Sequence, residues 1–249
     1  MSINDLPTRD DREGPFHRAG FLAAFAFLVL VLILGVTVVV THSSGKSDKA
    51  APAPSTGTTQ PTASSSPNNG NACGLSDVDQ TVPAAPPSNV SWKIYDTVAL
   101  PYSTTDGPGI VDGDVARCYA HTPTGALIAA AQIPVRYLVA NDWQAVVNEQ
   151  VMPGVGRAAY SKMRAQVTTN TNQPGDYGQI AGFQFITYSA NTAVVEIVSR
   201  FTNGNLQMVS TTLEWSGEDW KLQLQDSGGV SPNAQQVPNL TGFISWGGV

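Results

Sequence analysis

The sequence is poor in charge and in the residues that most often carry chemistry. Charged side chains make up 13% of its 249 residues, with 19 acidic and 13 basic. It has two cysteines and three histidines, and His121 is the only histidine after residue 42. No Gly-x-Ser-x-Gly motif is present, and the glycine-rich stretch 107–113 lacks the Gly-x-Gly-x-x-Gly spacing. This composition does not support a hydrolase of that type or a basic nucleic-acid-binding surface, and we expect no catalytic residue, metal site or cofactor.

The composition changes abruptly along the chain. Residues 1–18 are polar and charged, residues 19–41 are almost entirely apolar, and residues 42–89 are mostly Ser, Thr, Pro, Ala, Gly and Asn. Residues 90–249 have the mixed pattern of a folded domain that is large enough to bury one core. We therefore predict a short tail, one membrane span, a disordered linker and one folded domain.

The apolar segment is long enough to cross a membrane. Residues 19–40 contain no charged side chain, and a helix of that length extends about 33 Å against a hydrocarbon core of about 30 Å. A cleaved signal peptide is the alternative, although its apolar region is usually shorter. Three arginines before the segment and two lysines after it favour a cytoplasmic amino terminus. We predict a single-pass protein of the cell membrane, held there by residues 19–41, with an extracytoplasmic carboxyl-terminal domain.

The two cysteines are readily explained as one disulfide. Cys73 lies near the end of the predicted linker and Cys118 lies in the folded part. Two cysteines with no third left over in an extracytoplasmic domain favour a bridge, and the chain-entropy model gives a loop of this length about 4 kcal/mol of stabilisation. The bridge would tie the linker's end to the domain. Two unrelated thiols are the alternative.

Helices are expected first in the domain, after an opening strand over 90–100. Thr122 and Pro123 form a helix start, because Thr is a good N-cap and Pro suits the first helical position. Pro134 should kink or split this helix. Asp142 is expected to cap a second helix. A third is predicted over 156–169, and its core-facing stripe is expected to contain Ala159, Met163 and Val167, as Leu138 belongs to that of the first.

Strands are expected next, over residues 182–190, 192–201, 206–215 and 219–225. The last two flank a short Ser-Gly-Glu-Asp loop and predict a hairpin. Helices followed by antiparallel strands favour an α+β domain with its helices packed on one face of a curved sheet. The carboxyl-terminal segment has no clear periodicity, but four apolar residues in it are expected to dock on the domain or to form an interface with a partner: Leu240, Phe243, Ile244 and Trp246.

Four stretches carry a resemblance to a known group of proteins: VALPYSTTDGP, HTPTGALIAAAQIPVR, EDWKL and LTGFISWGG. Over about residues 90–249, and in its anchor and linker, the chain resembles membrane-anchored proteins of actinobacterial conjugative elements. The order of helices and hairpin is similar to the NTF2-like superfamily, in which bitopic scaffold components of type IV secretion and conjugation systems share this plan. The resemblance implies a non-enzymatic scaffold with membrane or secretion-apparatus partners, and with other copies of itself as possible partners.

Two other functions stay open at this stage. One is a module that binds a small apolar or cell-wall ligand in the concavity of the sheet. The other is an NTF2-like isomerase or dehydratase in which His121 acts with an aspartate such as Asp142 in a pocket. Residues 91–249 carry 8 basic and 12 acidic side chains, a net charge of −4. This balance argues against direct contact with nucleic acid.

Overall fold

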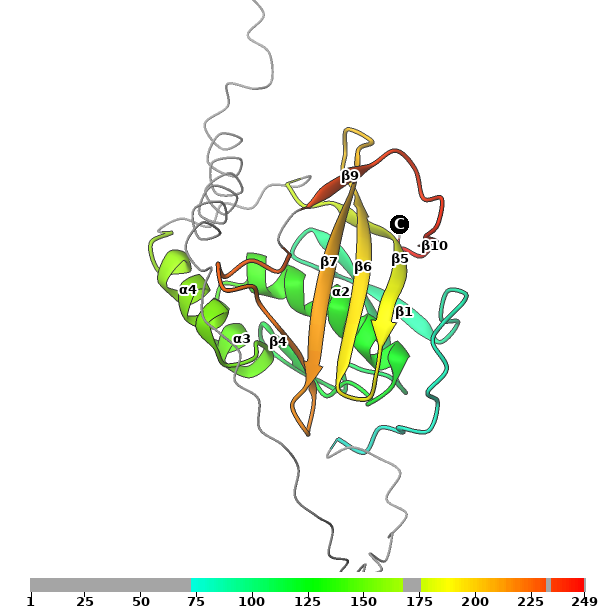
Figure 1. Ribbon diagram of the computed structural model, residues 1–249, viewed down its shortest axis with the longest axis horizontal. Helices are drawn as coiled ribbons and strands as arrows, with labels where there is room; N and C mark the ends of the chain where they lie inside the picture. Colours follow the sequence, from blue (N-terminus) through cyan, green and yellow to red (C-terminus); the bar gives the residue numbers. More distant parts are fainter. Residues whose placement is uncertain (1–72, 168–175, 232–233, 249) are drawn as a thin grey trace, which may run out of the picture. The chain divides into compact units, whose positions relative to one another are not determined.

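The domain is seen in a computed structural model that describes residues 73–167, 176–231 and 234–248 (Figure 1). The predicted tail, the predicted span over 19–41 and the linker as far as residue 72 lie outside the described residues. Within the described part, no helix has the length and apolar character needed to span a membrane. The described strands are β1 Val90–Tyr95, β2 Val98–Ser103, β3 Ile110–Asp112, β4 Val115–Arg117, β5 Gln179–Tyr188, β6 Thr192–Arg200, β7 Leu206–Trp215, β8 Trp220–Leu222, β9 Gln235–Val237 and β10 Ile244–Ser245. The described helices are α2 Pro123–Val139, α3 Trp143–Gln150 and α4 Val155–Arg164.

The main sheet is antiparallel and has the strand order β10-β5-β6-β7-β8, with β9 also paired to β7. Two hairpins, β1–β2 and β3–β4, form separate two-stranded sheets. Figure 1 shows α2 running across one face of the sheet, behind β6 and β7. The predicted α+β class, with helices packed on an antiparallel sheet, is therefore confirmed.

The start of α2 follows from its sequence. The Oγ1 of Thr122 accepts the backbone N–H of Gly125 at 3.0 Å, and Pro123 occupies the first helical position. The helix then runs through Pro134 as one element to Val139, so Pro134 does not split it as one form of the prediction required. Burial on several sides explains this tolerance: α2 lies between the sheet, the β1–β2 hairpin and α3, and packing on them outweighs one missing backbone hydrogen bond.

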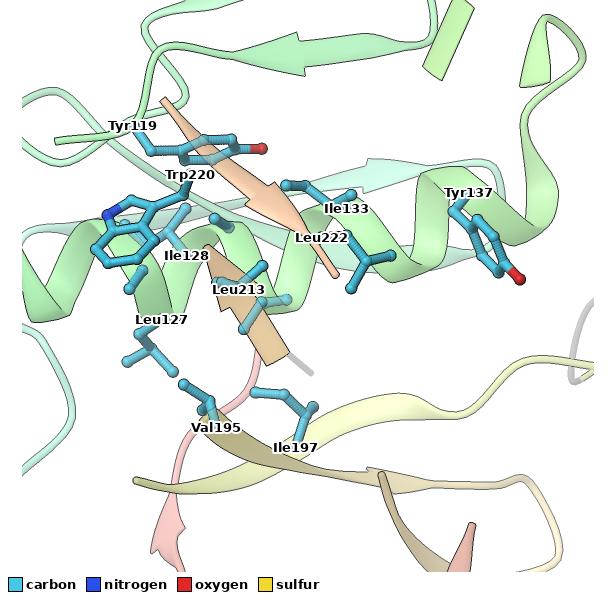
Figure 2. Packing of buried hydrophobic residues seen from close by; sticks show 14 of the residues in the cluster. Tyr119, Leu127, Ile128, Ile133, Tyr137, Val195, Ile197, Leu213, Trp220 and Leu222 are labelled. Carbon is cyan, nitrogen blue, oxygen red and sulfur yellow. The ribbon is translucent and has the colours of Figure 1, made fainter. Parts of the chain in front are cut away.

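The core lies between α2 and the sheet. Figure 2 shows Leu127, Ile128 and Ile133 of α2 facing side chains of β6, β7 and β8, which include Val195, Leu213 and Leu222. All six are fully buried. Burying one such side chain contributes about 1.5–3 kcal/mol, so this layer supplies much of the free energy that holds the helix on the sheet.

Three details of the sequence interpretation are wrong. The expected strand over 90–100 is the hairpin β1–β2, which turns at Asp96 with φ at 53°. In α4 the buried residues are Gly156, Tyr160 and Arg164, one position along from the expected stripe, and Val167 is exposed. In α2, Leu138 is 37% exposed, whereas Arg136 is 1% exposed.

Candidate functional site

The predicted disulfide is present and ties the amino-terminal end of the domain to its body. Cys73 and Cys118 are bridged, with Cα atoms 5.6 Å apart. Cys118 is buried and has a left-handed backbone conformation, with φ at 69°. We call the segment from Cys73 to Asn89 the strap. Its composition predicts that it belongs to the linker. The strap makes specific contacts with the body, so this last part of the predicted linker belongs structurally to the domain.

The strap is fixed over the start of α2 by hydrogen bonds to one residue. The Oδ1 of Asp77 accepts the backbone N–H of His121 at 3.0 Å, and the Nε2 of Gln80 donates to the backbone carbonyl of His121 at 2.7 Å. The hydroxyl of Tyr188 donates to the Oε1 of Gln80 at 2.8 Å, which connects the strap to β5. Both backbone polar groups of His121 are thereby used by the strap.

The ring of His121 is also held by its surroundings. It stacks on Trp215, with ring centroids 3.9 Å apart and an interplanar angle of 11°. Its Nε2 is hydrogen-bonded to the backbone carbonyl of Ala190. These contacts give His121 a structural role: it lies directly before Thr122, the N-cap of α2, and holds that turn against Trp215 and Ala190.

Asp142 lies at the other end of α2 and does not meet His121. Its Oδ1 accepts the backbone N–H of Ala145 at 3.1 Å, so it caps α3 as predicted. The 17 residues of α2 separate the two, a distance of about 25 Å along a helix axis. The structure therefore does not assemble the His121–Asp142 pair, and no group of three or more potential metal ligands occurs in the described segments.

Asp219 is a buried carboxylate that the sequence interpretation missed. Its Oδ2 accepts the backbone N–H of Cys118 at 2.7 Å, and its Oδ1 accepts those of Tyr119 at 2.9 Å and Trp220 at 3.0 Å. Burial raises the pKa of Asp219 to about 6, against the opposing effect of these three hydrogen bonds. Because both oxygens are occupied by backbone donors, the carboxylate connects the β7–β8 turn to the disulfide-bonded segment.

A second buried charge, Arg136, joins the two hairpins to α2. Its guanidinium donates to the Oε1 of Gln132, the backbone carbonyl of Asp114 and the hydroxyl of Tyr102, at 2.8–2.9 Å. It also lies over the ring of Tyr95, 4.1 Å from the centroid. The sequence offered one sign of this contact: Arg136 comes one helical turn after Gln132, so the two side chains lie on the same face of α2.

The four apolar residues of the carboxyl-terminal segment dock on the domain itself. Trp246 is 5% exposed, and its ring packs edge-on against Trp92 and Phe183. Ile244 pairs with Phe183 in the β10–β5 ladder. Leu240 and Phe243 are half-buried beside a small cluster on the opposite face of the sheet from α2. An interface made by this segment with another protein stays a prediction, and the buried Trp246 could take part only from within the domain.

Docking of this segment leaves an open groove at the edge of the sheet. The groove has a volume of about 520 Å³ and is lined by the end of the strap, β1, β5, the end of β6 and the carboxyl-terminal segment. Its lining residues are Pro86, Pro87, Trp92, Ile180, Ala181, Arg200, Leu240, Ser245, Trp246 and Gly247. It is the candidate binding site of the domain, and it differs in position from the His121 pocket that the sequence suggested.

The side chains of the groove are apolar or hydrogen-bond donors. Arg200 is exposed, and its guanidinium forms no hydrogen bond or ion pair with another described residue. The indole N–H of Trp246 is buried and has no acceptor among the described residues. Ser245 alone offers a side-chain acceptor, because arginine and tryptophan side chains only donate. The exposed guanidinium of Arg200 therefore suits a partner that brings an oxygen acceptor or a negative charge.

The fold and groove define a class of protein: a disulfide-tied α+β domain with an open surface groove and no assembled catalytic or metal-binding cluster among the described residues. The chain belongs to the family described as Domain of unknown function (DUF8175), whose model matches residues 51–245. Neither the curated proteins nor the solved structures contain a match to it. The family match begins before the strap and includes all of it.

Proposed function

We propose that the chain is a non-enzymatic assembly protein of the cell membrane. In this proposal residues 19–41 span the membrane, the amino terminus is cytoplasmic and the α+β domain, of NTF2-like type, lies outside. Its partners are other membrane or secretion-apparatus proteins, in an apparatus of the conjugation or type IV secretion kind. Direct contact with nucleic acid is not part of the proposed role.

The disulfide is the observation that carries this proposal. Structural disulfides persist in oxidising compartments outside the cytoplasm, and Cys73–Cys118 lies where the predicted linker meets the domain. Because the bridge fixes the first residues of the strap to the body, a pull on the linker would be transmitted to the domain core without peeling the strap away. That arrangement suits a domain held at a membrane by a flexible tether.

Confinement at the membrane supplies the mechanism. In this proposal the linker is flexible only before Cys73, which the disulfide fixes to the domain. About 31 such residues have a root-mean-square reach of about 30 Å. Partners within that reach experience a raised effective concentration of the domain, so contacts that are weak in solution become occupied.

The proposal is tested in intact cells of the source organism. Protease added outside should cut the domain at exposed loops between residues 90 and 249, while a resident cytoplasmic control protein stays whole. Crosslinking should then join the domain to components of a conjugation or secretion apparatus, and deletion of the gene should reduce transfer or export. A domain protected from external protease in cells whose known surface protein is digested contradicts the topology.

A ligand-binding role is the second candidate, and the groove favours it. A volume of about 520 Å³ with two tryptophans and one free arginine is enough for a small amphipathic anion. Native mass spectrometry of the purified full chain distinguishes the two, since a bound small molecule adds a defined mass that disappears in Arg200→Gln.

A further inference from the structure

The hairpin β3–β4 presents the chemistry that the groove lacks. All three residues of β3 are exposed, with Ile110 at 38% and Val111 at 49% exposure. The carboxylate of Asp112 at its tip makes no hydrogen bond or ion pair with another described residue. In the described part of the chain, β3 pairs only with β4, so one of its edges is open. Two apolar side chains beside an unpaired carboxylate are an unusual surface for a strand without a covering element.

The hairpin is also rigid. Its turn is anchored through Asp114, whose carboxylate accepts from the Tyr95 hydroxyl at 2.8 Å and from the backbone N–H of Asp142 at 2.8 Å. The backbone carbonyl of Asp114 accepts from the buried Arg136. On the other strand, the backbone N–H of Ala116 donates to Gln150 of α3. A projecting strand that is already ordered loses little conformational entropy when it binds.

We propose that β3 of one copy of the chain docks in the groove of a second copy, with Asp112 paired to Arg200 and with Ile110, which projects from the same face of the strand, against the groove's apolar side chains. The charges are complementary, and each is unpaired within the described part of its own chain. The exposed guanidinium of Arg200 is the charged donor that the carboxylate of the hairpin matches. This inference rests on the proposed function, because it names the first partner of the same assembly domain.

The contact has a defined symmetry and strength. The two surfaces are different parts of the chain. A reciprocal contact between two copies closes a two-fold dimer, whereas a one-way contact repeats head-to-tail into rings or filaments. One three-residue strand in one groove buries far less than the roughly 1,200 Å² typical of stable interfaces. Association is therefore weak in solution and becomes appreciable when copies share a membrane.

Charge reversal tests the pairing in liposomes. The full chain is reconstituted at one protein-to-lipid ratio, in two populations labelled at the amino terminus with a donor or an acceptor fluorophore, and association is measured by energy transfer. Arg200→Asp and Asp112→Arg should each lower association about tenfold, since each places like charges together. An equimolar mixture of the two variants, and the double variant Arg200→Asp with Asp112→Arg, should regain it. Lys162→Asp, which changes the net charge by the same amount at an exposed position on α4, should leave association unchanged.

Several outcomes overturn the proposal. They are a wild type without energy transfer, association that persists in Arg200→Asp, and a mixture that does not recover. A bound peptide or small molecule in the groove of a monomeric wild type overturns it in favour of another occupant. Failure of this contact is distinguishable from failure of the proposed function. A domain found on the cytoplasmic side, with energy transfer that follows charge reversal, overturns only the proposed function. Crosslinks to an apparatus in cells, with energy transfer that does not change in Arg200→Asp, overturn only the proposed contact between β3 and the groove.

Discussion

The carboxylate of Asp219 accepts the backbone N–H of Cys118 at 2.7 Å. One residue of the β7–β8 turn thus holds the cysteine that closes the disulfide, although the two are about a hundred positions apart in the chain. Two long-range constraints, one covalent and one electrostatic, therefore meet at a residue with a left-handed backbone. The groove, the strap and the first turn of α2 all depend on the position of this segment.

The first prediction concerns pH and Asp219. Its pKa is raised from 3.8 to about 6 by burial, so the folded state binds this proton more tightly than the unfolded state. Stability from this group is then fully present below pH 3.8 and is lost as pH rises through about 6. We expect Asp219 to raise the free energy of unfolding by about 2 kcal/mol between pH 7 and pH 4. Denaturant unfolding followed by tryptophan fluorescence measures this, since all five tryptophans lie in the domain.

Asp219→Asn provides the matched comparison. The asparagine keeps one carbonyl acceptor but cannot titrate, so the difference in stability between wild type and variant should change across pH 4–7. A difference that stays constant over this range contradicts the assignment of a raised pKa to Asp219.

The second prediction concerns the disulfide. Replacing both cysteines by serine should lower the free energy of unfolding by about 4 kcal/mol, because the unfolded chain regains the freedom of a 45-residue loop. The strap should also become sensitive to protease between Cys73 and Asn89, while the rest of the domain stays resistant. Reduction of the wild type with dithiothreitol should reproduce both effects. Free thiols at both positions in protein purified under non-reducing conditions would contradict the prediction.

The third prediction concerns the buried arginine. Arg136→Ala removes donors from Tyr102 and from the backbone carbonyl of Asp114 and leaves a cavity, which should cost about 3–5 kcal/mol. Arg136→Lys should recover little, because one ammonium cannot replace the planar fork that reaches three acceptors. Arg157→Ala is the control, because the guanidinium of this half-buried arginine of α4 donates to the exposed Asn148, and it is expected to cost under about 0.5 kcal/mol. Equal losses at both arginines contradict the role given to Arg136.

The sequence predicted the elements whose signals are local. Thr122 and Pro123 predict a helix start, because threonine is a good N-cap and proline suits the first helical position, and Asp142 predicts the start of α3 as an N-cap. The four-residue loop between Trp215 and Trp220 identified the β7–β8 hairpin. The disulfide followed from the number and place of the cysteines, which required no knowledge of the fold.

Other features depend on contacts between distant segments and have no local signal. Leu138 looks like a core residue of α2, but the core side of that turn is occupied by Arg136, whose partners come from both hairpins. The hairpin β1–β2 turns at Asp96-Thr97, which lacks the Asn-Gly or Asp-Gly pattern of common two-residue turns. The groove is assembled from five separate segments, so no single stretch of sequence marked it. Its arginine, Arg200, was indistinguishable from other surface charges.

The fourth prediction concerns how the carboxyl-terminal segment closes the groove. A Cβ added to Gly247 would overlap the backbone carbonyl oxygen of Ile180, and no side-chain rotation can relieve that clash. Gly247→Ala should therefore displace the segment from β5, expose Trp246 and cost about 1–3 kcal/mol. The exposure is measured as a red shift and stronger acrylamide quenching of tryptophan fluorescence. Ser245→Ala, at an exposed position of β10, should change neither quantity. Because the groove is built on this segment, Gly247→Ala should also weaken energy transfer between copies in liposomes as much as Arg200→Asp does. If Gly247→Ala exposes Trp246 but associates as fully as the wild type, the carboxyl-terminal segment is not needed for association, and the site of association lies elsewhere on the domain.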